Sequence, residues 1–405
     1  MGPVYSQKKD LAMVPLDDKK ENCCGCGACF CICPHEAIQM KTDREGFLYP
    51  DISPEKCVQC GLCRLACPVI TPERLPKNSA TPKVLAAWNL DPEIRRQSSS
   101  GGVFTVLAEE TLARGGVVFG AGFDKQWILR HTAAKNREEI AQFRGSKYLQ
   151  SDTGDVFYQI KEFLQQKKWV LFTGTPCKVA GLNAYLGEPY ETLLTCDFVC
   201  HGVPSPKVFY KYIYSLADKD HIKFINFRNK KYGWKRFSMH ILLEDKEYYT
   251  DLNKDIFLKA FLKDICLRPS CHKCSFASLQ RTSDITLGDF WGIGNSRPDL
   301  DDDQGTSLIL INSGQGKEFF DTCNERLFSA EMDLKTAIQG NPCLVKSVSA
   351  HPSREEFFRD LDRETFPRLI KTYLPPPTLM QKIRECISRI IRKLRKLFFG
   401  SIKFS

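Results

Sequence analysis

Six cysteines lie within the eleven residues CCGCGACFCIC, positions 23–33, and Pro34 follows them. A related stretch, EKCVQCGLCRLACP, places Cys57 34 residues after Cys23. Aligned with each other, the two copies share the spacing C-x2-C-x2-C-x3-C-P, which is the ligand pattern of ferredoxins with two 4Fe-4S clusters. The alignment selects four cysteines from each copy: Cys23, Cys26, Cys29 and Cys33 in the first, and Cys57, Cys60, Cys63 and Cys67 in the second.

The fourth cysteine of each copy binds the other cluster in such ferredoxins. We therefore expect a first cluster on Cys23, Cys26, Cys29 and Cys67, and a second on Cys57, Cys60, Cys63 and Cys33. Cys24 and Cys31 are left over, and we interpret them as small apolar residues packed near the clusters. Structural zinc also binds C-x2-C pairs, but its four-ligand sites have little use for a third C-x2 step and a proline in both copies.

The remaining composition describes a large chain with reduced cysteines. Its 405 residues are 42% hydrophobic, enough for two or three globular parts. Residues 1–22 contain no apolar run of signal-peptide length, so we expect a cytoplasmic protein whose 19 cysteines bind metal or stay reduced rather than form disulfides. The net charge is +10, but residues 378–405 alone carry eight basic and one acidic residue, which leaves +3 for the rest. That balance gives no reason to expect a nucleic-acid partner.

The order of apolar and polar segments predicts five regions. We expect an N-terminal segment at 1–20, a ferredoxin-like two-cluster domain at 21–72, a proline-rich linker at 73–83, a larger domain at 84–345 and a basic tail at 375–405. In the larger domain, KVLAAWNL, VVFGAGF, WVLFTG and LLTCDFVC read as buried strands, and helices are expected after SSSGG and from Pro176. Strands that alternate with helices through short turns predict an α/β layer with parallel pairing, so the whole chain reads as α+β and α/β.

Three loops of this domain carry candidate chemistry. Serines and glycines at Ser98–Gly102 precede a helix, which suits either an anion such as a phosphate or an ordinary N-terminal cap. Cys177 lies at a helix start, where a thiolate is favoured. With Cys200, Cys271 and Cys274 it is a candidate for a third cluster site, and scattered buried thiols are the alternative. Three consecutive acids, Asp301–Asp303, suit a solvated turn better than a divalent-metal site.

Eight short segments occur in one order across about residues 84–312: SSSGGVFT, RGGVVFGAGFD, RGSKYLQSD, FTGTPCKVAGL, CHGVPSP, INFRNKKYGW, RPSCHKC and SDITLGDFWG. In these segments the chain resembles the coenzyme F-420 hydrogenase/dehydrogenase beta subunit family, in its form with a fused two-cluster ferredoxin domain. The family includes deazaflavin-dependent hydrogenase subunits and the plant 7-hydroxymethyl chlorophyll a reductase. The resemblance implies an iron–sulfur flavoprotein oxidoreductase with FAD in the larger α/β domain.

The resemblance also implies where the cofactors lie. It favours Cys177, Cys200, Cys271 and Cys274 for a cluster beside the flavin. The expected FAD surroundings are Ser99, Ser100, Gly101, Gly102, Lys147, Tyr148, Gln150, Ser151, Thr173, Gly174 and Thr175. His201, Asp289 and Lys147 are proton-donor candidates by residue type alone, so the catalytic residues stay unknown. No residue demands coenzyme F-420 itself.

These assignments predict that a ferredoxin-type partner exchanges electrons with the N-terminal clusters, and that FAD passes them to an organic acceptor. The substrate and the direction of electron flow stay open. A non-catalytic electron-transfer subunit that feeds a partner enzyme is the alternative. A redox sensor would need a DNA-binding or regulatory element, and none is recognisable in the sequence.

The tail has apolar residues at helical spacing and basic residues between them. Its apolar stretches are too short for a spanning helix of about 20 residues. We expect an amphipathic helix on an anionic membrane surface, peripheral at the inner face. Docking onto the same chain or onto a partner uses the same pattern and is the alternative.

Overall fold

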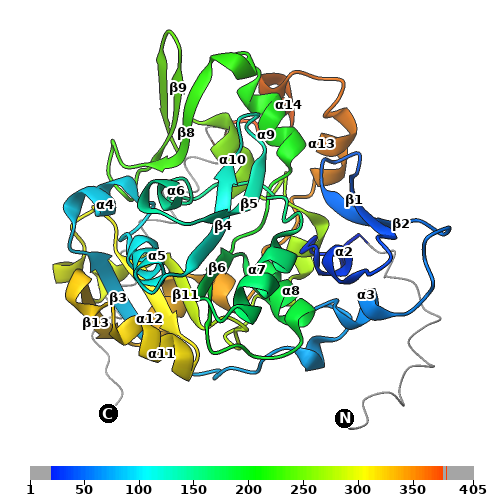
Figure 1. Ribbon diagram of the computed structural model, residues 1–405. Coiled ribbons are helices and arrows are strands. Elements are labelled where there is room, and N and C mark those ends of the chain that lie inside the picture. The colour runs from blue at the N-terminus through cyan, green and yellow to red at the C-terminus, as the bar shows by residue number, and fades with distance from the viewer. Residues whose placement is uncertain (1–19, 377–379, 381–405) are drawn as a thin grey trace, which may run out of the picture.

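A mixed eight-stranded sheet forms the centre of the molecule (Figure 1). The computed structural model describes residues 20–376 and 380. The order across the sheet is β13-β3-β12-β11-β7-β6-β4-β5. The strands are β3 (Lys83–Asn89), β4 (Val117–Phe123), β5 (Leu129–Ala134), β6 (Val170–Gly174), β7 (Leu193–Phe198), β11 (Ile285–Asp289), β12 (Ser307–Ile311) and β13 (Leu327–Met332).

The four central strands, β4, β6, β7 and β11, pair in parallel, and antiparallel strands extend the sheet at both edges. The parallel strands are apolar runs because both of their faces are covered, as in other α/β sheets. β6, for example, reads VLFTG, and its first three residues are buried. The expected α/β layer with parallel pairing is therefore confirmed, whereas the antiparallel edges were not predicted.

Helices cover both faces of this sheet. Successive residues of a strand point to opposite faces, so Val118 of β4 joins one core with α5 (Val103–Ala113) and α11 (Gly314–Asp321). Val117 and Phe119 join another core with α7 (Val156–Gln165) and α8 (Pro176–Leu186). The face that α7 and α8 cover is covered by α12 (Leu334–Gly340) towards β3. The shorter helices of this part are α4 (Pro92–Gln97) and α6 (Arg137–Ala141).

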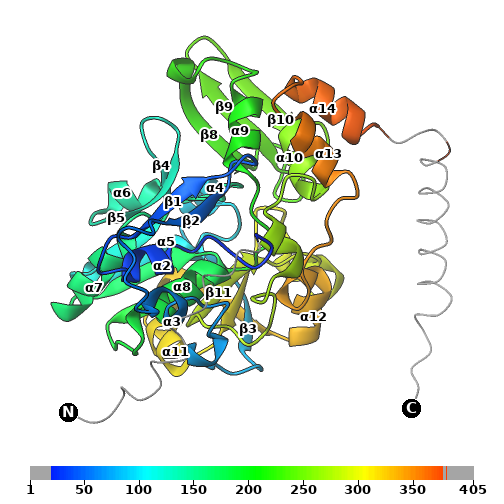
Figure 2. The same cartoon turned by 90° about the vertical axis from the view of Figure 1, so that its right-hand side faces the viewer.

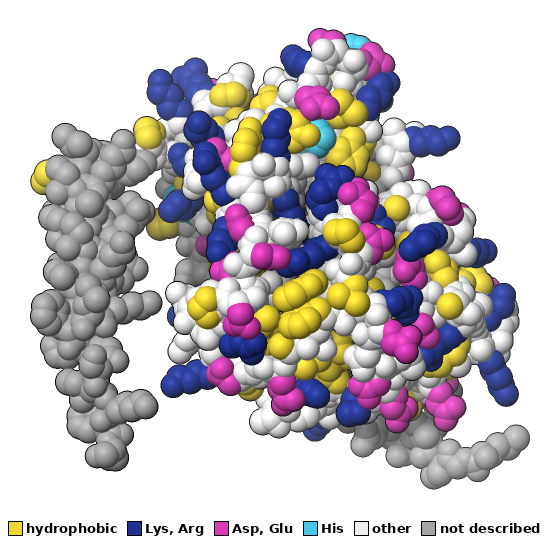
Figure 3. All heavy atoms as spheres, turned by 90° about the vertical axis from the view of Figure 1, so that its left-hand side faces the viewer, with side chains coloured by type: hydrophobic (Ala, Val, Ile, Leu, Met, Phe, Trp, Pro, Cys, Tyr) yellow, Lys and Arg dark blue, Asp and Glu magenta, His cyan; other side chains and the backbone are white. Residues whose placement is uncertain are grey.

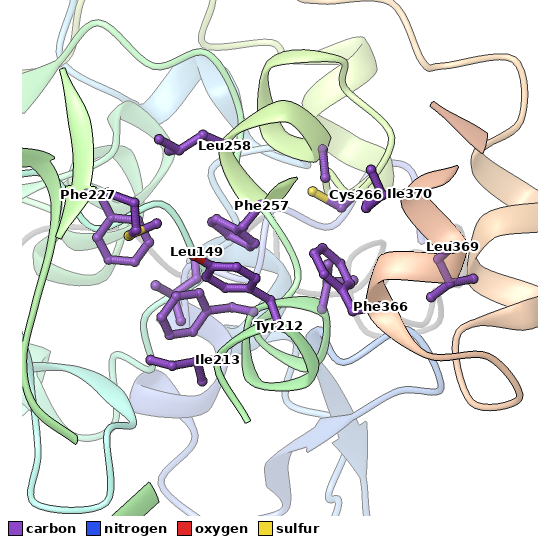
Figure 4. Close-up of a cluster of buried hydrophobic side chains, with 14 of the residues drawn as sticks. Leu149, Tyr212, Ile213, Phe227, Phe257, Leu258, Cys266, Phe366, Leu369 and Ile370 are labelled. Carbon is purple, nitrogen blue, oxygen red and sulfur yellow. The ribbon is translucent and has the colours of Figure 1, made fainter. Parts of the chain in front are cut away.

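A second, antiparallel sheet of order β10-β9-β8 stands beside the first. Its strands are β8 (Ile222–Asn229), β9 (Ser238–Leu243) and β10 (Glu247–Asp251). One aromatic-rich core joins this sheet to α9 (Pro206–Ile213), α10 (Ile256–Leu262), α13 (Arg354–Asp360) and α14 (Phe366–Tyr373); Figure 4 shows Tyr212, Phe257 and Phe366 at its centre. The expected end of the larger domain at 345 therefore leaves out two helices that share its core.

The N-terminal module consists of two short helices and a hairpin. α2 (Ala28–Ile32) and α3 (Leu62–Leu65) follow Gly27 and Gly61, whose φ angles of 87° and 76° are accessible mainly to glycine. The hairpin pairs β1 (Ile38–Thr42) with β2 (Leu48–Ile52). α2 packs on α7 and α8, so the module lies across these helices (Figure 2).

The residues between the module and β3 are held against the larger part of the chain. The expected linker, 73–83, begins in a short 3-10 turn (Pro72–Arg74), and Asn78 Nδ2 donates a hydrogen bond to the Ser283 carbonyl (2.8 Å). Of the expected tail, 375–405, only residues 375, 376 and 380 lie within the described part of the chain. No helix among residues 20–376 and 380 has the length and apolar character needed to cross a membrane. On the face in Figure 3, basic and acidic side chains are interspersed.

Candidate functional site

The ferredoxin cysteines fall into two groups in space. Burial raises the pKa of Cys29 well above its ordinary value, the thiols of Cys26, Cys23 and Cys67 act on it next, and the thiol of Cys63 acts less than these. Burial also raises the pKa of Cys63, and the thiols that act on it are Cys60, Cys57 and Cys33. Cys67 therefore lies with the cysteines of the first copy, and Cys33 with those of the second.

These are the two ligand sets that the spacing predicts, and their binding of two clusters stays a prediction. Within residues 20–376 and 380, no three or more metal-binding side chains converge on one ion position. A 4Fe-4S cluster is held by four thiolates. Each of these thiolates binds a different iron, so they do not converge on one ion. The donor chemistry of both groups fits such clusters.

The two left-over cysteines have different environments. Cys31 is buried in the core beneath α2, and its Sγ lies 3.4 Å from the Gly154 carbonyl oxygen, in agreement with a packing role. Cys24 instead lies in hydrogen-bond contact with the thiols of Cys177 and Cys26. The contact with Cys24 lowers the pKa of the Cys177 thiol to about 6, although burial alone would raise it. Cys24 thus connects the ferredoxin module to the start of α8, a contact that no spacing in the sequence signals.

The four cysteines proposed for a third cluster line one small cavity of about 70 Å³, and Cys24 and Cys343 line it as well. Cys177 is in the first turn of α8, and Cys200 follows β7. Cys271 lies in a 3-10 turn, Pro269–Lys273, and Cys274 directly follows this turn. β6 and β7 are parallel neighbours, with Gly174 opposite Asp197, so the residues that follow them emerge at the same edge of the sheet. This topology explains why Cys177 and Cys200 meet.

The small cavity also offers hydrogen-bond donors. Arg281 lines it, only 2% of this residue is exposed, and its Nε and Nη2 have no hydrogen-bond partner among the described residues. Its Nη1 lies 3.5 Å from Oδ2 of the buried Asp197. Four thiols with two unused N–H donors fit a 4Fe-4S cluster, whose sulfurs accept such hydrogen bonds.

A second cavity, of about 650 Å³, adjoins the first and shares Cys200, His201 and Cys343 with it. It lies where β6, β7 and β11 end, which is the usual ligand position in open α/β sheets. Its volume is typical of a ligand or cofactor site, about 300–1,000 Å³. Nine of the eleven residues expected around FAD line it: Ser99, Ser100, Gly102, Lys147, Tyr148, Ser151, Thr173, Gly174 and Thr175.

Gly101 and Gln150 do not line this cavity. The Gly101 N–H donates to Ser307 Oγ (2.9 Å) and its carbonyl accepts from the Asn89 N–H (2.7 Å), so it packs against the sheet. Gln150 Oε1 accepts hydrogen bonds from the Leu48 N–H (3.0 Å) and Arg268 Nη1 (3.3 Å). Gln150 therefore binds the ferredoxin hairpin. Both positions were expected at the flavin because of the family resemblance, but each makes its hydrogen bonds away from the cavity.

Lys147 lines the large cavity with its ammonium held by backbone carbonyls. Nζ donates to the carbonyls of Gln142 (2.7 Å) and Arg144 (3.1 Å). Burial and the Arg144 charge lower the pKa of Lys147 to about 7. Lys147 can therefore hold or release a proton near neutral pH.

The other two proton-donor candidates also line the cavity but differ from each other. His201 Nε2 lies 2.6 Å from Asp264 Oδ1, and Nδ1 lies 3.8 Å from Cys343 Sγ. Burial opposes the charged form of His201, but these contacts raise its pKa to about 9. Asp289 accepts two hydrogen bonds from Arg228 (2.8 and 3.1 Å) and one from Trp234 (2.6 Å). Asp289 is thus an ion-pair partner of Arg228.

Arg228 and His131 line the cavity too, although neither was singled out from the sequence. Arg228 is buried on β8 of the second sheet, and its Nε has no hydrogen-bond partner in the described part of the chain. His131 Nδ1 lies 3.0 Å from Ser151 Oγ, and burial lowers its pKa well below the ordinary value. Arg228 belongs to the segment INFRNKKYGW, but nothing in that segment indicates that its strand folds over the cavity.

The acidic run Asp301–Asp303 is exposed at Asp302 and also forms ion pairs. Asp302 accepts two hydrogen bonds from the buried Arg95 (both 2.8 Å), and Asp301 pairs with Lys235 (2.6 Å). These carboxylates therefore stabilise the fold as ion-pair partners.

Comparison of the sequence with known protein families shows which class of protein this chain belongs to. Residues 22–70 match the 4Fe-4S dicluster domain, so the protein is an iron–sulfur electron-transfer protein of the oxidoreductase class. Residues 84–157 and 167–336 match the N-terminal and C-terminal parts of the coenzyme F420 hydrogenase/dehydrogenase beta subunit. The chain belongs to this family, with a fused dicluster domain.

Individual relatives are distant. The chain is 26% identical over 331 residues to an uncharacterized protein, MJ1349, of Methanocaldococcus jannaschii, which covers 74% of this chain and 85% of the relative. A chain in a xenon-derivatised structure of the F420-reducing NiFe hydrogenase complex from Methanosarcina barkeri overlaps with a TM-score of 0.45 and 20% identity. That overlap covers 67% of this chain and 91% of the other.

Proposed function

We propose that this protein is an iron–sulfur flavoprotein oxidoreductase that passes electrons from a ferredoxin-type carrier, through three 4Fe-4S clusters, to FAD and then to an organic acceptor. The observation that carries this proposal is the order of the sites. The first ferredoxin cysteine group contacts Cys177 through Cys24, and the cavity around Cys177 shares Cys200 and His201 with the large cavity. The chain therefore offers one continuous series of redox sites.

The second cysteine group, Cys57, Cys60, Cys63 and Cys33, is the outer end of this series. Cys60 is exposed, and so is its neighbour Val58, at 60% of its surface. The first group is more enclosed, because Cys26 is buried against α8. A soluble electron carrier would therefore exchange electrons at the second group.

The residues of the large cavity suit a dinucleotide with a negative diphosphate. Arg228 and Lys147 line it with positive groups, and Ser99, Ser100 and Gly102 lie just before α5, where the helix dipole favours an anion. A bound flavin supplies the conversion between one-electron and two-electron chemistry. Lys147, with a pKa of about 7, is the group we propose to place a positive charge against the bound FAD below neutral pH.

The proposal is tested by the cofactor content of the purified chain. Anaerobic purification should yield about twelve irons, an equal amount of sulfide and one FAD per chain. The chain alone should then transfer electrons from a reduced ferredoxin to an artificial organic acceptor. About eight irons without flavin would contradict it. Full cofactors with no acceptor reduction until a partner is added would indicate an electron-transfer subunit instead.

We further propose a cytoplasmic protein whose residues 378–405 bind an anionic membrane surface. The support is the sequence pattern of nine charged residues, eight of them basic, among apolar residues at helical spacing. Each basic group contributes about 1 kcal/mol of attraction to such a surface.

A further inference from the structure

Arg268 contacts the ferredoxin module and the small cavity at the same time. Its Nε donates to the Cys23 carbonyl (2.8 Å), and its Nη2 lies 3.6 Å from Cys23 Sγ. The same side chain lines the small cavity beside Cys177 and Cys271. Only 1% of the residue is exposed. One buried guanidinium therefore faces a cysteine of the first group and cysteines of the third.

This charge has no carboxylate partner within ion-pair distance among residues 20–376 and 380. Its neutral contacts are the Gln150 side chain (3.3 Å to Nη1) and the face of Tyr49, whose ring centre lies 4.0 Å from Cζ. A buried charge is costly unless an opposite charge compensates it. Cysteine thiolates that hold clusters would supply that opposite charge on both sides of the guanidinium.

We propose that Arg268 raises the reduction potentials of the first ferredoxin cluster and of the third cluster together, as a shared positive charge between them. The inference rests on the proposed third cluster. A cluster becomes more negative when it is reduced, so a fixed positive charge close to it stabilises the reduced form. Nearby charge and hydrogen bonds to the sulfurs are known determinants of cluster potential, and their effect is strong where water is excluded.

The second cysteine group lies outside the contacts of Arg268. The Arg268 side chain hydrogen-bonds to Cys23 and Gln150, and among the described residues none of these hydrogen bonds goes to Cys57, Cys60, Cys63 or Cys33. The second cluster therefore serves as an internal reference in the same molecule.

The test is a redox titration of the anaerobic, fully loaded chain, followed by electron paramagnetic resonance. Arg268→Gln should make reduction of the first and third clusters about tenfold less favourable, a shift of about 59 mV each for a one-electron couple, and leave the second unchanged. Arg268→Lys keeps the charge and should retain most of the potential. Gln150→Glu keeps the shape of the side chain but places a carboxylate next to Arg268 Nη1. It should lower both reduction potentials, as R268Q does.

A matched control is Arg354→Gln. Arg354 is also buried, donates to the carbonyl of Leu267 (2.9 Å) and pairs with Glu45 of the ferredoxin hairpin (2.6 Å), but contacts no cluster cysteine. R354Q should lower the melting temperature without moving a cluster potential. Unchanged potentials in both R268Q and Q150E, with iron content intact, would overturn the inference. About eight irons in the wild-type chain would remove the third cluster, and that result would also overturn the shared role of Arg268.

Discussion

Gly181 of α8 lies directly against Cys26, so that a Cβ atom at Gly181 would be 2.9 Å from Cys26 Sγ and 2.7 Å from its Cβ. Cys177 is four residues earlier on the same helix, about 6 Å along its axis. The close packing of the ferredoxin module on α8 therefore depends on a residue without a side chain. The first and third cysteine groups approach each other at this point.

We predict that Gly181→Ala separates the ferredoxin module from α8. Alanine favours a helix by about 1 kcal/mol over glycine, but overpacking costs about 1–3 kcal/mol. The variant should therefore lose stability and pass electrons between the groups more slowly, as measured by thermal unfolding and by stopped-flow reduction. Gly314→Ala is the control, because Gly314 faces open space at the start of α11. Equal electron-transfer rates in G181A and G314A would contradict the prediction.

Loss of a third-group cysteine should remove one cluster. Cys177→Ala or Cys274→Ala is expected to lower the iron content by about a third, from about twelve to about eight per chain. Cys323→Ala is the comparison, since Cys323 is buried beneath α11 and belongs to none of the three groups. Iron analysis of the three variants decides the assignment. Unchanged iron in C177A and C274A would exclude these residues as ligands.

FAD binding should weaken as the pH rises through the pKa of Lys147. This pKa is lowered from 10.5 to about 7, so the ammonium is charged below about pH 7 and neutral above it. Loss of one charge contact of about 1.4 kcal/mol raises the Kd for FAD about tenfold. Fluorescence titration of the flavin-stripped chain between pH 6 and 9 measures this change. Lys147→Arg should bind equally across the range, and Lys125→Met, at an exposed lysine, should behave as the wild type.

The Glu45–Arg354 pair should hold the ferredoxin hairpin to the C-terminal helices. The two side chains are about nine-tenths buried and 2.6 Å apart. Removing one partner of a buried pair leaves the other charge without compensation, which costs about 3–5 kcal/mol. Glu45→Ala should therefore lower the free energy of unfolding by this amount in chemical denaturation. The double variant Glu45→Ala/Arg354→Met should recover part of it, and an additive loss would argue against the pair.

Deletion of residues 378–405 should abolish binding to anionic vesicles. The segment carries +7, more than half of the net charge of the chain. Sedimentation with phosphatidylserine-containing vesicles at low and physiological salt measures the effect, because screening weakens surface attraction. Neutral phosphatidylcholine vesicles are the control. Equal sedimentation of the full and truncated chains would show that another surface binds the membrane.

The parts of the fold that were predictable are those with a local signal. Buried strands such as β6 are recognisable as short apolar runs, and a strand followed by a helix requires a crossover, so parallel pairing followed. β8–β10 carried no comparable signal, because their apolar residues are shared with α9, α10, α13 and α14 in one core. Residues that reach the large cavity from this sheet, Arg228 above all, were missed for the same reason.

By itself, the sequence determined the cysteine spacing of the two-cluster module, the family and the parallel layer, because each depends on residues close together in the chain. The tertiary structure alone decided that Cys24 contacts Cys177, that Gln150 binds the hairpin and that Arg268 lies between two cysteine groups. Arg268 and Cys23 are 245 residues apart. Contacts over such separations are set by how α8, the hairpin and the cysteine loops pack, and side-chain packing leaves no periodic pattern in the sequence.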